Sequence, residues 1–127
     1  MAKQLTARGR VFKSSAFAKI ARKADIEDEV LCTAIREVMN GQCDDLGGGV
    51  FKKRLNKNLH RSIILAKGGR LWVFVFLFAK KDRENIQDDE LRDFRMLAKA
   101  YENLADKQLT QLVKDKSLTE ICHDHQA

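Results

Sequence analysis

The stretch from Gly47 to Ile86 decides the fold: GGGVFKKRLNKNLHRSIILAKGGRLWVFVFLFAKKDRENI. At its centre lies an unbroken apolar run, Leu71 to Ala79, which is rich in β-branched and aromatic residues and follows a Gly-Gly turn. A short apolar run of this composition is typical of a strand that is buried on both faces of a sheet. We therefore predict a central strand here, with the rest of the chain arranged around it.

Two further strands are predicted before the central one, from Val50 to Leu55 and from Leu59 to Ala66. Short turns at Asn56 to Asn58 and at Lys67 to Gly69 connect them to a third strand, Arg70 to Lys80, so the three form an antiparallel meander. The three glycines that precede it, 47–49, are not followed by a helix or by a G-K-[ST] motif, which excludes a P-loop. We expect a loop there with backbone angles that favour glycine.

Two helices are predicted before the meander. A short strand, Arg10 to Lys13, precedes Ser14 and Ser15, which are suited to cap a helix with apolar positions on one face. A second helix, with an apolar stripe from Val30 to Met39, is expected to end at Asn40-Gly41. We expect the two helices to pack together as an antiparallel hairpin.

After the meander, the spacing of Leu91, Phe94 and Ala98 predicts a third helix, which Asp88 or Asp89 would cap and which would cover the open face of the sheet. The length of 127 residues fits a single domain. We place its core at about 11–105 and a C-terminal helical extension at 106–127. The predicted fold class is α+β: an N-terminal helical hairpin on a small antiparallel β-sheet, with C-terminal helices.

The composition, 44% hydrophobic and 33% charged, fits a globular protein. No apolar run approaches the roughly 20 residues of a membrane-spanning helix, and the first residues do not resemble a signal peptide. Cys32, Cys43 and Cys122 lack the spacing of a metal-binding or disulfide framework, so we expect isolated reduced thiols. We expect a cytoplasmic protein without membrane contact.

Positive charge concentrates on the meander. Between Val50 and Lys81 there are nine basic residues and no Asp or Glu, within a chain of net charge +6. These residues are Lys52, Lys53, Arg54, Lys57, Arg61, Lys67, Arg70, Lys80 and Lys81. Such a concentration suits a polyanion such as a nucleic acid, although charge alone also fits a solvated surface.

The residue types on the meander favour metal-free chemistry on RNA. A metal-dependent nuclease needs carboxylates on its cation, and this region has none before Asp82. Lys or His can instead take a proton from a 2′-hydroxyl and return one to the leaving oxygen, while Arg stabilises the charged phosphate. The terminal Cys122-His123-Asp124-His125 lacks a second ligand cluster, so we expect a frayed tail and no metal site.

Two motifs resemble a known family. They are L-G-G-G-V-x-K-K-R, from Leu46 to Arg54, and F-A-K-x-x-R-x-N-I, from Phe78 to Ile86. In this order and spacing they resemble the RelE/HigB-like toxins of bacterial type II toxin–antitoxin systems, with similarity from about Val11 to Ala100. The resemblance implies a compact fold of two N-terminal helices against an antiparallel sheet. It also implies a ribosome-dependent mRNA endonuclease that needs no metal and no other cofactor.

The resemblance also implies partners and site residues. The partners would be mRNA, the ribosome and a cognate antitoxin, commonly a helix-turn-helix protein, which covers the toxin in a hetero-oligomer. Together with the chemistry above, it gives a predicted catalytic set of Lys53, Arg54, His60, Arg61, Lys80 and Arg83. The predicted RNA-binding set is Lys52, Lys57, Lys81 and Asn85.

One position departs from the family, because His60 stands where a Tyr is usual, although an imidazole can also stack on a base or transfer a proton. Two alternatives stay open at this point. A toxin of the same fold could inhibit DNA gyrase, and the basic surface could belong to a non-catalytic RNA-binding module.

Overall fold

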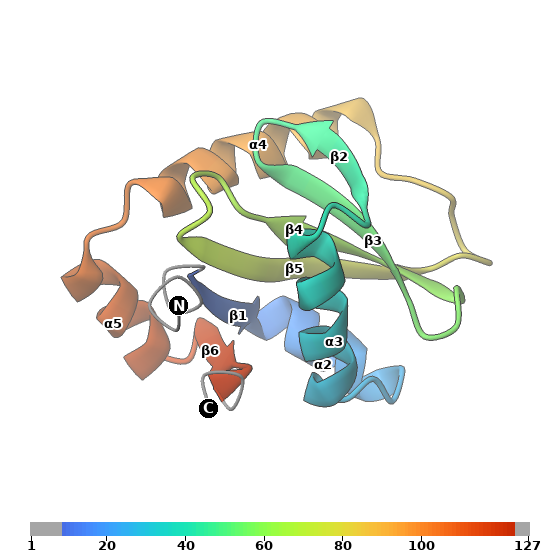
Figure 1. Ribbon diagram of the computed structural model, residues 1–127, viewed down its shortest axis with the longest axis horizontal. Coiled ribbons are helices and arrows are strands. Elements are labelled where there is room, and N and C mark those ends of the chain that lie inside the picture. The colour runs from blue at the N-terminus through green and yellow to red at the C-terminus, as the bar shows by residue number, and fades with distance from the viewer. Residues whose placement is uncertain (1–8, 124–127) are drawn as a thin grey trace.

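The computed structural model describes residues 9–123, which form a six-stranded sheet with the order β2-β3-β4-β5-β1-β6 (Figure 1). Its strands are β1 (Arg10–Ser14), β2 (Asp44–Gly47), β3 (Val50–Leu55), β4 (His60–Leu65), β5 (Leu71–Ala79) and β6 (Leu118–Ile121). The helices are α2 (Ser15–Lys23), α3 (Asp28–Met39), α4 (Asp88–Glu102) and α5 (Asp106–Lys114). The α+β class and the β3-β4-β5 meander are as predicted.

The apolar run forms the central strand β5, and each of its faces contributes to a different core. Phe74 and Leu77 pack into a cluster with α2 and α3, whereas Val73 and Phe78 pack into a cluster with α4 and α5. A strand between two helical layers must be apolar on both sides, which explains why this segment does not alternate with polar residues.

The sheet is mixed, which corrects the prediction of an antiparallel sheet. β1 pairs with β5 in parallel and with β6 in antiparallel orientation. The parallel pair brings Arg10 opposite Leu71, residues far apart in the sequence. A pairing between such distant segments depends on the path of the whole chain, so the short strand alone did not indicate it.

The two N-terminal helices lie on one face of the sheet (Figure 1). Ser14 caps α2 as predicted, since its hydroxyl accepts a hydrogen bond from the Phe17 amide at 3.1 Å. α3 ends at Met39 with Asn40 as its C-cap, and Gly41 has a φ of 86°, which matches the predicted stop. The antiparallel hairpin expected for the two helices stays a prediction.

α4 and α5 lie on the opposite face, with Ala98 and Leu109 buried against the sheet. The helix that we predicted after the meander is therefore confirmed as α4, but neither Asp88 nor Asp89 caps it. Gln87 is the N-cap, and its backbone N–H donates to the Glu90 carboxylate at 2.7 Å. This arrangement is a capping box, in which the third residue of the helix satisfies the amide of the cap residue.

Two short edge strands differ from the prediction. β2 (Asp44–Gly47) is a strand that we did not predict, whereas residues 47–49 form the predicted glycine turn, with φ values of 87°, 66° and 87°. The C-terminal segment is helical only from Asp106 to Lys114. It then returns to the sheet as β6, where Leu118 and Ile121 enter the two cores.

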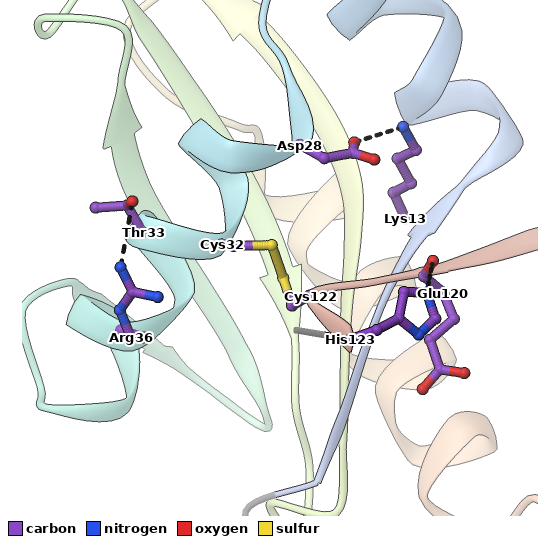
Figure 2. Close-up of a disulfide and its surroundings, with 8 residues drawn as sticks. All are labelled: Lys13, Asp28, Cys32, Thr33, Arg36, Glu120, Cys122 and His123. Carbon is purple, nitrogen blue, oxygen red and sulfur yellow. Dashed lines mark hydrogen bonds and ion pairs between the residues drawn. A yellow bond between two sulfur atoms is a disulfide. The ribbon is translucent and has the colours of Figure 1, made fainter. Parts of the chain in front are cut away.

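A disulfide corrects the prediction of reduced thiols. Cys32 of α3 and Cys122, just after β6, are joined across a sequence separation of 90 residues, while Cys43 is free (Figure 2). The fold, and no local sequence spacing, brings these two cysteines together. Figure 2 also shows the ion pair between Lys13 and Asp28, which ties β1 to the start of α3.

Candidate nucleic-acid interface at the end of the sheet

The basic residues gather where β3, β4 and β5 meet the hairpin of residues 56–59 and the loop of residues 80–87. In the strand register, Arg54 lies opposite Arg61, and Arg61 lies opposite Phe78. The Lys80 amide donates to the Leu59 carbonyl at 2.9 Å, which holds the start of the loop against the hairpin. One end of the sheet therefore carries positively charged residues from β3, from β4 and from both connections.

Strand alternation divides these residues between the two faces of the sheet. Val50 belongs to the core under α4 and Leu55 to the core under α2 and α3, so Lys52 and Arg54 lie on the α4 face and Lys53 on the other. Arg61 pairs with Arg54 and shares the α4 face. We call the residues Lys52, Arg54, Arg61, Arg83 and Asn85 the arginine face.

Arg61 is the most enclosed member of the arginine face, with 9% of its surface exposed. Its Nη1 donates to the carbonyl of Asn58 at 3.1 Å, to the Asn58 side-chain oxygen at 3.1 Å and to the His60 carbonyl at 3.3 Å. Its other two nitrogens form no hydrogen bond within residues 9–123, and neither is a buried atom without a partner. They therefore reach solvent and can donate to an incoming anion.

Arg83 is held from several sides. Its guanidinium lies 5.3 Å from the centre of the Phe78 ring and 5.7 Å from that of Phe76, and its Nε donates to the Asn85 carbonyl at 3.0 Å. Both Nη atoms pair with the Glu90 carboxylate. Phe78, which lies under the Arg83 guanidinium, is also the cross-strand neighbour of Arg61 in the register.

Lys52 and Asn85 complete the arginine face. The Lys52 ammonium lies 3.3 Å from the Asn85 side-chain oxygen and 3.8 Å from the Asp44 carboxylate. The first contact joins β3 to the loop before α4. A polar side chain from that loop is thereby placed beside the cations of the sheet.

Two residues of the predicted catalytic set point to the other face. Lys53 pairs with Glu37 of α3 at 2.9 Å and donates to the Gln42 carbonyl at 2.9 Å. His60 lies opposite Ala79, and its Nδ1 is 3.2 Å from the Asn56 amide nitrogen. β2 pairs with β3 only as far as Lys52, so a hollow lined by Lys52, Lys53 and Arg54 opens at the free edge beyond that residue.

The remaining predicted residues, Lys57, Lys80 and Lys81, are exposed around the same end of the sheet. Their side chains form no hydrogen bond or ion pair with the described part of the chain. Lys57 lies at the tip of the hairpin, between Asn56 and Asn58, and all three have a positive φ. These lysines therefore form a rim of exposed positive charge around the arginine face.

Three groups that were not predicted from the sequence also shape this site: Asn58, Glu90 and the Phe76–Phe78 pair. Asn58 and Phe76 belong to segments that were read only for their secondary structure. Glu90 stands three residues after Gln87, a spacing that is typical of a capping box and so could have drawn attention to it.

Residues 9–123 contain no group of three His, Cys, Asp or Glu side chains that could hold a metal ion. None of the helices in that range combines the length and the apolar character needed to span a membrane.

Fold and site together define a small α+β domain with a cluster of arginines suited to a phosphate backbone. Over residues 9–121 the chain matches the family described as the RelE toxin of the RelE/RelB toxin–antitoxin system, and it belongs to this family. It is thus a toxin of a toxin–antitoxin system, a class that typically cleaves mRNA, and its partner is a cognate antitoxin. The corresponding searches found no matching curated protein and no matching solved structure.

Proposed function

We propose that this toxin is a metal-independent endoribonuclease that cleaves mRNA on the ribosome, inhibits translation and arrests growth. The observation that carries the proposal is the convergence of Arg54, Arg61 and Arg83 at one end of the sheet. Arg83 lies over Phe78, Arg61 is the cross-strand neighbour of Phe78, and each arginine retains N–H groups that no described residue occupies. Guanidinium groups fixed in this way suit the charge of a phosphate in the transition state.

In the proposed reaction, the 2′-hydroxyl of one nucleotide attacks the adjacent phosphorus, and the bond from phosphorus to the 5′-oxygen breaks. The products are a 2′,3′-cyclic phosphate and a 5′-hydroxyl. Arg61 and Arg83 donate hydrogen bonds to the non-bridging oxygens, where negative charge accumulates. One proton must leave the 2′-hydroxyl and another must reach the 5′-oxygen.

We assign these proton transfers to lysines, because the strand alternation turns His60 away from the arginine face. Lys52 lies on that face, and Lys80 is exposed at the end of β5 beside it. Lys53, which Glu37 and Gln42 hold on the other face, would contact RNA only from the free edge of β3. Lys57 and Lys81 would contribute phosphate contacts at the rim.

The test is induced expression of the chain in bacteria, with mRNA 5′ ends mapped while growth is followed. Arg61→Lys is the informative variant, since it keeps the charge and loses the planar fork. Arg70→Ala is the matched control, because Arg70 precedes β5 and lies at its opposite end from Lys80. We expect new mRNA ends and growth arrest in the wild type and in the control, and neither in Arg61→Lys.

Purified protein tests the finer parts of the proposal. When EDTA is added, cleavage of mRNA on programmed ribosomes should decrease only by the amount that ribosome dissociation explains. Naked mRNA should be cleaved far more slowly than mRNA on the ribosome. Arrest without new ends would contradict the proposal and favour gyrase inhibition. RNA binding without arrest would favour a non-catalytic binding module. Co-purification with the protein encoded beside this toxin would test the proposed helix-turn-helix antitoxin and the hetero-oligomer.

A further inference from the structure

The Glu90 carboxylate performs two tasks at once. It accepts a hydrogen bond from the Gln87 amide and thereby begins α4, and it also pairs with both Nη atoms of Arg83. The hydrogen bond from Arg83 is the largest cause of the lowered pKa of Glu90, and the Gln87 amide is the second. A charge on the arginine face is in this way connected to the first turn of a helix that packs on the sheet.

This connection matters because Arg83 belongs to a loop. Residues 80–87 between β5 and α4 include no helix or strand, and a long side chain on such a segment samples many rotamers. The Phe76 and Phe78 rings lie beneath the guanidinium, but a cation above a ring can still slide across it. The two-point contact with Glu90 fixes both its position and its rotation.

The ion pair leaves Arg83 able to bind a phosphate. A guanidinium has five N–H groups. One is engaged by the Asn85 carbonyl and two by Glu90, so two remain without a partner in the described part of the chain. Glu90 therefore does not occupy the edge of Arg83 that a substrate would need.

We propose that Glu90 is the positioning residue for Arg83, which holds the guanidinium above Phe76 and Phe78 with its free N–H groups available to the scissile phosphate of mRNA. This inference rests on the proposed nuclease function and adds a residue to it. An acidic group beside an RNA site would otherwise only weaken binding through charge repulsion. The two roles therefore predict opposite effects when the charge is removed.

The decisive variant is Glu90→Gln. A Gln at this helix position can still accept from the Gln87 amide, so the capping box is preserved while the charge that holds Arg83 is lost. Glu84→Gln is the matched control, because Glu84 is an exposed acid next to Arg83 with no hydrogen bond or ion pair to residues 9–123. Thermal unfolding of all variants checks that they fold equally well.

The measurement is single-turnover cleavage of mRNA on programmed ribosomes at several toxin concentrations. For Glu90→Gln we expect the maximal rate to fall about tenfold or more, with unchanged or tighter half-saturation, because a misplaced Arg83 affects the transition state more than binding. Glu84→Gln should stay within about twofold of the wild type. Glu90→Asp, which keeps the charge on a shorter side chain, should lie between them and replaces Glu90→Gln if that variant does not fold.

A double-mutant cycle shows whether Glu90 acts through Arg83. In the Arg83→Ala background, Glu90→Gln should cause no further loss beyond about twofold, since the group that it positions is absent. A full rate in Glu90→Gln, or an equal loss in both backgrounds, would overturn the inference and leave the nuclease proposal intact. A wild-type toxin that cleaves no mRNA on the ribosome would overturn both.

Discussion

Arg61 places a positive charge in a nearly closed position, 9% exposed, and no acidic side chain among residues 9–123 forms an ion pair with it. Carbonyl and amide oxygens of the hairpin hold one of its nitrogens instead. Because these oxygens carry no full charge, the guanidinium keeps its own charge for a phosphate.

The first prediction concerns the shape of this group. Arg61→Lys keeps the charge but offers an ammonium that cannot contact Asn58 and a phosphate at the same time. We expect cleavage to fall about a hundredfold or more, and the free energy of unfolding to fall by about 1 kcal/mol through lost hairpin hydrogen bonds. Single-turnover cleavage and urea unfolding measure the two effects. Near-normal cleavage would show that charge alone suffices at this position.

The second prediction concerns His60, which lies on the face of the sheet that α2 and α3 cover and contacts Asn56. If proton transfer belongs to the lysines, His60→Ala should cleave mRNA at a rate within about threefold of the wild type, whereas loss of a general acid or base costs about a hundredfold or more. Cleavage assays of His60→Ala beside Lys52→Ala and Lys80→Ala distinguish the assignments. A large loss in His60→Ala alone would return the catalytic role to the imidazole.

The third prediction concerns the ion pair between Arg10 and Glu120, which joins β1 to β6 at 2.7 and 2.8 Å. The hydrogen bond from Arg10 lowers the pKa of Glu120 below its usual value of 4.5. A lowered pKa in the folded state stabilises the protein above pH 4.5, and this stabilisation is lost as the pH falls through the folded-state pKa. The difference in Tm between the wild type and Glu120→Gln should thus be largest near neutral pH and vanish in acid. A difference that grows in acid would contradict it.

At the scale of elements, the β3–β4 hairpin carries backbone strain. Asn56, Lys57 and Asn58 have φ values of 53°, 55° and 72°, and Lys is poorly suited to that region, whereas Asn tolerates it. The fourth prediction is that Lys57→Gly raises the free energy of unfolding by up to about 1 kcal/mol, because relief of strain exceeds the added chain entropy. Urea unfolding checks this, with Lys57→Ala as the control that removes the side chain and keeps the strain.

The elements also show what sequence patterns could predict. β5, α2, α3 and α4 were predictable because apolar periodicity and capping residues are local signals. β2 and β6 were not, since each has four residues and exists only through its partner strand. The same holds for the parallel β1–β5 pair, which depends on how helices return the chain to the sheet.

In the candidate site, too, features with a local sequence signal could be predicted, and features that depend on distant partners could not. The charge-rich meander indicated the basic residues, and the two-residue period of a strand explains why Lys53 faces away from Lys52 and Arg54. The sequence did not indicate that Arg83 would lie over Phe78, because a register shift between Ile63 and Ile64 sets which β5 side chains reach that face. Such an irregularity has no simple sequence signature here.

At the scale of the whole molecule, the Cys32–Cys122 disulfide joins α3 to the last strand. The fifth prediction is that reduction lowers the free energy of unfolding by about 4.6 kcal/mol, the chain-entropy estimate for a loop of 90 residues. Thermal unfolding with and without a dithiol measures it. Cys122→Ser should resemble the reduced protein and not respond to dithiol, whereas Cys43→Ser should behave like the wild type. An equal Tm with and without dithiol would contradict the prediction.

The same bond changes what happens when the chain is pulled from its ends. The residues between Cys32 and Cys122 form a covalent ring, so pulling on the two ends can extend only the segments outside the ring. The ring keeps about 300 Å of contour length from being extended. An ATP-driven protease that translocates substrates through a narrow pore would have to admit two segments of the polypeptide side by side at the disulfide. The oxidised toxin would therefore resist translocation into such a protease, while the reduced toxin could be translocated as a single polypeptide segment.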